Sequence, residues 1–217
     1  MTPLNFAIES KCLSLIKFII ANGANVNQSA LYLQTPLHRA IYNDMNEAIK
    51  ILLENNASVA KTPYSRSPLY AASYKGNNKA IQLLIQYGAQ INEEGHDEIR
   101  ESPLSIAVIL KHTETIKLLI DLGANVDTMW LAGAIGSIDA VKSLLVNGVD
   151  INQKGNMNET ALFPAILHNE IDFVQFLVEN GADVNAHNFF QDSPLSVAQK
   201  AKKTNIAEYL LSKGAFV

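Results

Sequence analysis

The sequence predicts an all-α solenoid of seven stacked helix-turn-helix units, with residues 1–217 forming a single domain. Three observations lead to this prediction. A Thr/Ser-Pro-Leu tripeptide recurs along the chain, and a short segment that usually starts with Gly follows each copy. Between the tripeptide and this segment, apolar residues recur at three- and four-residue spacing. Such self-similarity is typical of proteins whose repeats stack side by side and share one continuous core.

Each tripeptide predicts the start of the first helix of a repeat. A Ser or Thr side chain caps a helix by accepting a hydrogen bond from a free backbone amide, and Pro suits the first helical turn. The copies are Thr2-Pro3-Leu4, Thr35-Pro36-Leu37, Ser67-Pro68-Leu69, Ser102-Pro103-Leu104, Thr160-Ala161-Leu162 and Ser193-Pro194-Leu195. Small residues three positions after each Leu favour close stacking of these helices, at Ala7, Ala40, Ala72, Ala107, Ala165 and Ala198.

The second helix of each repeat is predicted from an apolar stripe, for example Ile49, Leu52 and Leu53. Its end is predicted from a residue that tolerates the left-handed conformation, which is Gly in six repeats and Asn56 in the other. The endings are residues 23–27, 56–60, 88–92, 123–127, 148–152, 181–185 and 214–217. Seven endings against six tripeptides indicate a hidden seventh start.

Alignment backward from Leu144 places the hidden start at residues 127–129, with Met129 at the Leu position and Ala132 at the small position. The repeat leucine positions are then 4, 37, 69, 104, 129, 162 and 195, with spacings of 33, 32, 35, 25, 33 and 33. The approximate repeats are 1–33, 34–65, 66–100, 101–126, 127–158, 159–191 and 192–217. The short spacing predicts that one projecting hairpin, or finger, is missing between repeats four and five.

These motifs resemble the ankyrin family, whose repeat starts with Thr-Pro-Leu-His and ends with Gly-Ala-Asp-Val-Asn. The resemblance covers the whole chain and implies a finger followed by two antiparallel helices in each repeat. It implies a structural role for His38 in the start motif. It also implies that partners bind along the fingers and the exposed face of the first helices.

Composition argues against several other classes of function. The formal net charge of −4 provides no positive field for nucleic acid or an anionic membrane surface. Cys12 is the only cysteine, which excludes an internal disulfide and fits a reducing compartment. No stretch is long and apolar enough to span a membrane, and no signal peptide precedes the first repeat. We therefore expect a cytoplasmic monomer, or one secreted into a host cell without a cleavable signal peptide.

The chain shows no pattern that predicts catalysis. We find no nucleophile with a base, no clustered metal ligands and no glycine-rich phosphate loop, so we expect no enzyme activity, cofactor or metal. The lengthened finger 93–101 carries five carboxylates without the regular spacing of a calcium loop. It is interpreted as a solvated acidic loop that could meet a basic partner.

The candidate partner-binding residues are apolar side chains at predicted finger tips and first-helix positions. One patch across repeats two and three joins Tyr32, Tyr42, Tyr64 and Tyr74, with Leu31 beside it, and a second joins Ile109, Leu110, Trp130, Ile135 and Leu167 near the missing finger. Phe189 and Phe190 form another tip. Trp130 has two interpretations: it fills the space left by the missing finger, or it anchors a partner.

The leading hypothesis is a module that binds a protein or peptide through its concave groove and finger tips. An alternative is a regulator that blocks an enzyme or toxin, as an immunity protein does. A secreted bacterial effector that acts as an adaptor is also open, since Asn-, Ile- and Lys-rich usage suits an AT-rich genome.

Overall fold

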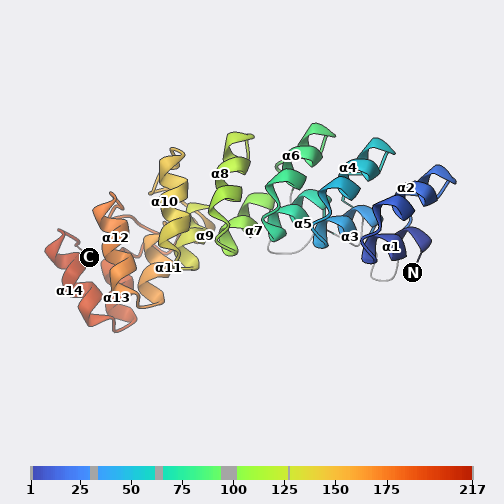
Figure 1. Ribbon diagram of the computed structural model, residues 1–217. Coiled ribbons are helices and arrows are strands. Elements are labelled where there is room, and N and C mark those ends of the chain that lie inside the picture. The colour runs from blue at the N-terminus through green and yellow to red at the C-terminus, as the bar shows by residue number, and fades with distance from the viewer. Residues whose placement is uncertain (1, 30–33, 62–65, 94–101, 127, 217) are drawn as a thin grey trace. The chain divides into compact units, whose positions relative to one another are not determined.

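The computed structural model describes residues 2–29, 34–61, 66–93, 102–126 and 128–216. These residues form α-helices and one short 3-10 helix, and they contain no strand (Figure 1). The first helices of the pairs are α1 (Pro3–Glu9), α3 (Pro36–Tyr42), α5 (Pro68–Lys75), α7 (Pro103–Ile109), α9 (Met129–Ala134), α11 (Leu162–Leu167) and α13 (Pro194–Lys200). The second helices are α2 (Leu13–Ala21), α4 (Asn46–Glu54), α6 (Asn78–Gln86), α8 (Thr113–Asp121), α10 (Ile138–Val146), α12 (Ile171–Glu179) and α14 (Thr204–Ser212). The predicted all-α solenoid of paired helices is confirmed.

The chain divides into two compact units, Met1–Ala107 and Val108–Val217. In the first unit, α1 packs on α3 and α3 on α5, while α2, α4 and α6 form a parallel second row (Figure 1). In the second unit, α9, α11 and α13 pack in order, and α8 packs on α10 and α12 on α14. That residues 1–217 form a single domain, with the repeat boundaries given above, stays a prediction.

The predicted caps start five of the first helices, whereas the prediction is wrong at Thr160, whose buried hydroxyl has no hydrogen-bond partner and which precedes Ala161, the N-cap residue of α11. The hydroxyl of Thr2 accepts a hydrogen bond from the Asn5 N–H, and that of Ser67 accepts one from the Tyr70 N–H, over 3.2 and 3.1 Å. Thr35, Ser102 and Ser193 make the same bond three residues along the chain. Each bond satisfies one of the amides that the first turn of a helix leaves without a partner.

The core consists of the residues that recur in each repeat. Leu37 and Ala40 are fully buried, and so are Met129 and Ala132 of the hidden repeat. In the second helices the apolar stripe is buried in the same way, as Ile49 shows in α4. Because alanine leaves no bulk between neighbouring helices, the first helices pack closely on one another.

The second helices end as predicted, in the left-handed region. Gly88 has φ of 88°, and Asn56, which takes the glycine position of repeat two, has φ of 62°. Asn tolerates this conformation better than other residues with a side chain, apart from Asp. The chain therefore reverses direction at the same point in both repeats.

The missing finger between repeats four and five is confirmed. Only residues 122–128 join α8 to α9, whereas residues 147–161 join α10 to α11. The latter segment includes the short 3-10 helix η2 (Asn156–Asn158). Within the second unit, α9 thus follows α8 without a projecting hairpin between them.

Candidate partner-binding surface

At three places the base of a finger is held by an asparagine that reaches the next repeat. The Asn152 side chain donates to the Gly181 carbonyl over 3.0 Å, and its oxygen accepts from the Asp183 N–H over 2.7 Å. Asn27 and Asn185 make the same pair of bonds to the endings of the repeats that follow them. These bridges fix the fingers relative to one another, so that side chains at their tips have defined places.

A buried asparagine holds the finger between α12 and α13. The side-chain oxygen of Asn188 accepts from the N–H groups of Phe190 and Asp192, over 2.9 and 3.0 Å. The Phe189 N–H donates to the Met157 carbonyl of the preceding finger over 2.7 Å. These bonds fix the backbone that carries Phe189 and Phe190, whose side chains are exposed.

Met157, Phe189 and Phe190 together form an exposed apolar surface, which we call the tip cluster. Their side chains are 60%, 68% and 65% exposed, and the two phenyl rings lie edge to face with centroids 5.6 Å apart. Met157 also has φ of 54°, which an L residue adopts only at a cost. Exposed aromatic rings on a fixed backbone are a feature of binding surfaces rather than of folding cores.

In the first unit, the structure brings Tyr42 and Tyr74 together. Their rings lie edge to face with centroids 6.4 Å apart, and they are 37% and 46% exposed. Burial, and secondarily the neighbouring Tyr74, raises the pKa of the Tyr42 hydroxyl above its ordinary value. The other predicted members of this surface, Leu31, Tyr32 and Tyr64, lie outside the described residues.

Trp130 lies at the start of α9 and contacts the finger that follows α10. Its indole N–H donates to Glu159 over 3.3 Å, and a Cβ added to Gly155 would lie only 2.5 Å from the Trp130 Cβ. The side chain is half-buried. This geometry favours a packing role for Trp130 against its own chain.

The second predicted patch is divided between the two ends of the first helices. Trp130 is near the start of α9, whereas Ile135 caps its end and Leu167 is the last residue of the neighbouring α11. Ile109 ends α7 and is half-buried, and Leu110 follows it with its side chain exposed. That Trp130 and the other four form one contiguous surface stays a prediction.

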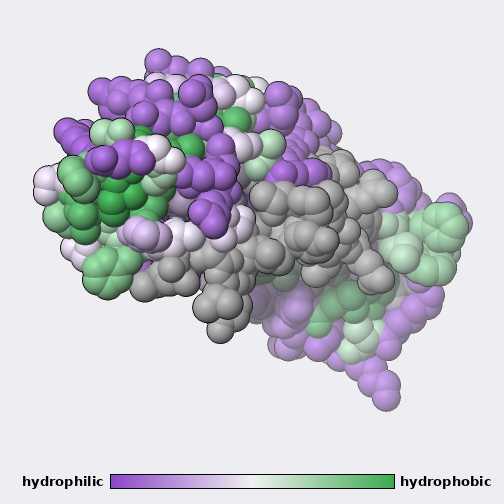
Figure 2. All heavy atoms as spheres, turned by 90° about the vertical axis from the view of Figure 1, so that its right-hand side faces the viewer, coloured by the Kyte–Doolittle hydropathy of each residue, from purple (hydrophilic) through white to green (hydrophobic). Residues whose placement is uncertain are grey.

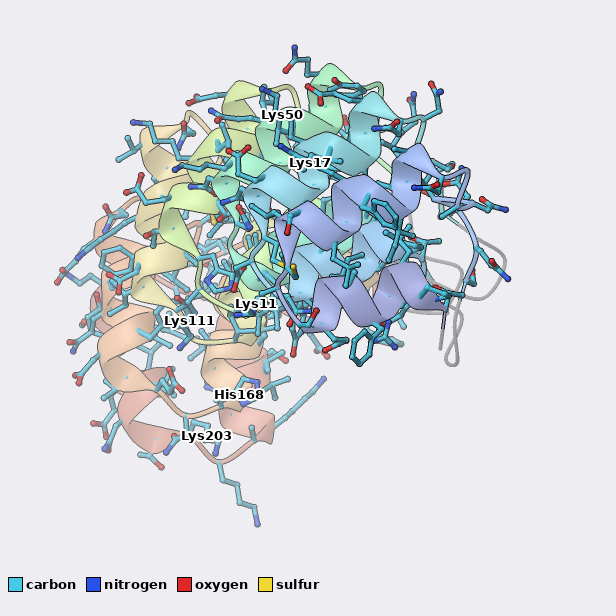
Figure 3. All side chains as sticks on the ribbon, turned by 45° about the vertical axis from the view of Figure 1, so that its right-hand side comes forward. Lys11, Lys17, Lys50, Lys111, His168 and Lys203 are labelled. Carbon is cyan, nitrogen blue, oxygen red and sulfur yellow. The ribbon has the colours of Figure 1, made fainter. Side chains whose placement is uncertain are left out.

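Polar residues cover other parts of the surface. Lys17 of α2 and Lys50 of α4 occupy equivalent exposed positions on the second helices (Figure 3). Lys111 and His168 lie in turns between paired helices (Figure 3). Exposed apolar side chains also lie outside the finger tips, at Phe6, Phe18 and Val146, so exposure alone does not single out the tips.

Histidines and carboxylates are dispersed in the part of the chain that the structure describes. No group of three His, Cys, Asp or Glu residues there is arranged to hold a metal ion. His38 is buried, its Nε2 donates to the Arg66 carbonyl over 2.8 Å, and its Nδ1 accepts from the Thr35 hydroxyl over 2.8 Å. Burial lowers the pKa of this imidazole. No described helix is long and apolar enough to cross a membrane.

Sequence reasoning missed several of these features. It recognised the recurring Asn at the end of Gly-Ala-Asn-Val-Asn, but not that this side chain bridges to the next repeat. It also named Phe189 and Phe190 as a tip without joining Met157 to them. The signal for the bridges was present, because an Asn recurs at residues 27, 92, 152 and 185.

Comparison with known proteins supports this architecture. The family described as "Ankyrin repeats (3 copies)" matches residues 1–63, 37–130 and 128–217. The crystal structure of the human ASB11 ankyrin repeat domain aligns with a TM-score of 0.80 and 27% identity, over 98% of this chain and 97% of that one. The ankyrin repeat domain of Bcl-3, described as a unique member of the IkappaB protein family, aligns with a TM-score of 0.80 and 24% identity, over 96% and 98% of the two chains.

A short stretch of the chain is also similar to a much larger protein. Over 54 residues it is 39% identical to the human transient receptor potential cation channel subfamily A member 1. This stretch is 25% of this chain and 5% of the channel.

Ankyrin repeat domains bind proteins and are typically non-catalytic. Since the family's repeats match along the whole length, this chain belongs to the ankyrin repeat family.

Proposed function

We propose that this chain binds a partner protein through its finger tips and the exposed face of its first helices, with the tip cluster as the main anchor. The observation that carries the proposal is the exposure of Met157, Phe189 and Phe190 on neighbouring fingers joined by a backbone hydrogen bond. None of these side chains is required to fill the core beneath them.

The energetics favour such a role. Each phenyl ring leaves about two thirds of its surface in water, and covering it contributes roughly 25 cal/mol per Å² of apolar area. The backbone that carries the rings is already fixed by Asn188, so binding costs little further ordering of the finger. Rigid aromatic side chains with few rotatable bonds are common among the residues that dominate interfaces.

Tyr42 and Tyr74 form a second proposed anchor, on the first unit. Their rings contact one another and remain partly exposed, so a partner could cover both at once. Leu31, Tyr32 and Tyr64 are proposed neighbours of this pair on sequence grounds. Ile109, Leu110, Ile135 and Leu167 remain proposed contacts at the ends of first helices, while Trp130 is the least suited because it already packs on Gly155.

The proposal is tested by comparing three forms of the chain. The first is the wild type, the second is Phe189→Ser/Phe190→Ser, and the third is Val146→Ser as a matched control. Val146 is 85% exposed and is the last residue of α10 rather than part of a finger, so its change removes an exposed apolar side chain from a different place. Circular dichroism first establishes that all three have equal helical content.

Proteins captured from lysate of the source cells are then quantified for each form. A protein captured by the wild type and the Val146 variant, but lost from the double variant, supports the tip cluster as the anchor. Equal capture by all three forms contradicts that role. A parallel Tyr42→Ala/Tyr74→Ala variant tests the second anchor in the same way.

A further inference from the structure

A groove of about 610 Å³ lies between the endings of repeats two and three. It is lined by Val59, Ala60 and Lys61 on one side and by Gly88 to Glu93 on the other. All of these residues belong to the first unit. Figure 2 looks onto the N-terminal end and shows hydrophobic residues gathered there, where Phe6 and Phe18 are exposed. The groove is a separate feature, and its lining contains both polar and apolar residues.

In repeats one, five and six, an asparagine side chain lies at the place that corresponds to this groove. Asn27 donates from its amide nitrogen to the Asn56 carbonyl over 3.1 Å and accepts from the Ser58 N–H over 2.7 Å. Asn152 and Asn185 make equivalent bonds in the second unit. In every case a carboxamide joins the carbonyl of the residue that ends a second helix to the N–H two residues later.

Repeat two has Ala60 in the place of this asparagine. By register, the groups that its side chain would meet are the Gly88 carbonyl and the Gln90 N–H, which both line the groove. Among the described residues, neither group has a hydrogen-bond partner. The methyl group of Ala60 therefore leaves one donor and one acceptor open to solvent in the geometry that a carboxamide fills elsewhere in the chain.

We propose that this groove binds the side-chain carboxamide of an Asn or Gln residue on a partner protein. A primary amide offers one N–H donor to the Gly88 carbonyl and one oxygen acceptor to the Gln90 N–H. A carboxylate has only acceptors and an ammonium group only donors, so neither satisfies both backbone groups. That the carboxamide belongs to a partner protein depends on the proposed function, whereas the amide-binding site itself is inferred from the groove alone.

The rim of the groove fits a neutral group. Lys61 Nζ and Glu93 Oε1 lie 3.9 Å apart, so the two charges next to the site offset one another. The volume exceeds that of a single amide, which leaves room for the aliphatic stem of the side chain and adjacent backbone. Val59 and Ala89 provide apolar surface for that stem.

Titration of the ¹⁵N-labelled chain with acetamide, followed by backbone amide NMR, tests the site without a protein partner. We expect a saturable downfield shift of the Gln90 amide proton. The amide protons of Ser58, Asp183 and Phe216 are internal controls, because an asparagine side chain already bonds each of them. N,N-dimethylacetamide lacks an N–H donor, so it should shift Gln90 less.

Two variants make the test specific. Ala60→Asn supplies the carboxamide from the chain itself and should abolish the Gln90 shift. Asn152→Ala opens the equivalent site in repeat five and should make the Asp183 amide proton respond to acetamide. A Gln90 shift that persists in Ala60→Asn, or that does not exceed those of the three control amides, overturns the proposal. This outcome leaves the capture experiment on the tip cluster unaffected, because that experiment uses a different surface.

Discussion

The indole N–H of Trp130 donates a hydrogen bond to the Glu159 carboxylate over 3.3 Å. This bond joins the start of α9 to the base of the finger that precedes α11. Gly155 lies against the same side chain, so closely that a Cβ there would approach the Trp130 Cβ to 2.5 Å. The only tryptophan of the chain thus packs beneath a finger of its own unit.

Replacement of Gly155 by Ala should therefore destabilise the protein. The added methyl group meets the Trp130 side chain and forces the finger outward, at a cost of about 1–3 kcal/mol in the free energy of unfolding. Urea denaturation followed by the fluorescence of the single tryptophan measures this change. The nearby exposed Lys154→Ala should change stability by less than about 0.5 kcal/mol. Equal stability of the Gly155→Ala variant and the wild type would contradict the close packing.

The asparagine bridges should contribute measurably to stability. Asn152→Ala removes two hydrogen bonds between neighbouring repeats and should lower the free energy of unfolding by about 1–2 kcal/mol. Ala60→Asn should raise it by a similar or smaller amount, because it adds the equivalent bridge. Gln82→Ala, an exposed change on α6, is the control for a surface substitution. If Ala60→Asn is neutral while Asn152→Ala is destabilising, the two sites are not equivalent.

Asn5 should be a suboptimal residue at its position. It is fully buried, and neither its side-chain nitrogen nor its oxygen has a hydrogen-bond partner in the structure. His38, at the equivalent position of repeat two, reaches the Arg66 carbonyl. By register Asn5→His should reach the Gln34 carbonyl and raise the free energy of unfolding by about 1 kcal/mol. Thermal and urea denaturation measure the change, and a less stable variant would show that the longer ring does not fit.

Acid should destabilise the protein through His38. Burial holds the pKa of His38 below its ordinary value of 6.5, so the folded state binds fewer protons than the unfolded state just below that pH. The contribution is fully present above pH 6.5 and is lost as the pH falls toward the lower pKa of the folded state. The free energy of unfolding should decrease across this range in the wild type, and the decrease should be smaller in His38→Gln. Identical pH profiles for the two proteins would contradict this assignment.

Local signals in the sequence were sufficient for the repeat architecture. The cap at Ser67 acts on an amide three residues away, and Asn56 or Gly88 ends a helix through its own backbone angles. Each signal involves only a few neighbouring residues and recurs in most repeats. Repetition even identified the start at Met129, which lacks the tripeptide, and the missing finger before it. The candidate tyrosines at residues 42 and 74 came from the same register.

Contacts between repeats were decided only by the tertiary structure. Asn152 and Gly181, Met157 and Phe189, and Trp130 and Glu159 are each about 30 residues apart in the sequence, a separation at which no local pattern fixes geometry. Trp130 illustrates the limit: its sequence position allowed a partner anchor or a packing residue, and only the tertiary structure brings Gly155 and Glu159 against it. The sequence by itself determined where the first helices begin and the second helices end, whereas side-chain reach between stacked fingers determined which polar groups are paired and which rings stay exposed.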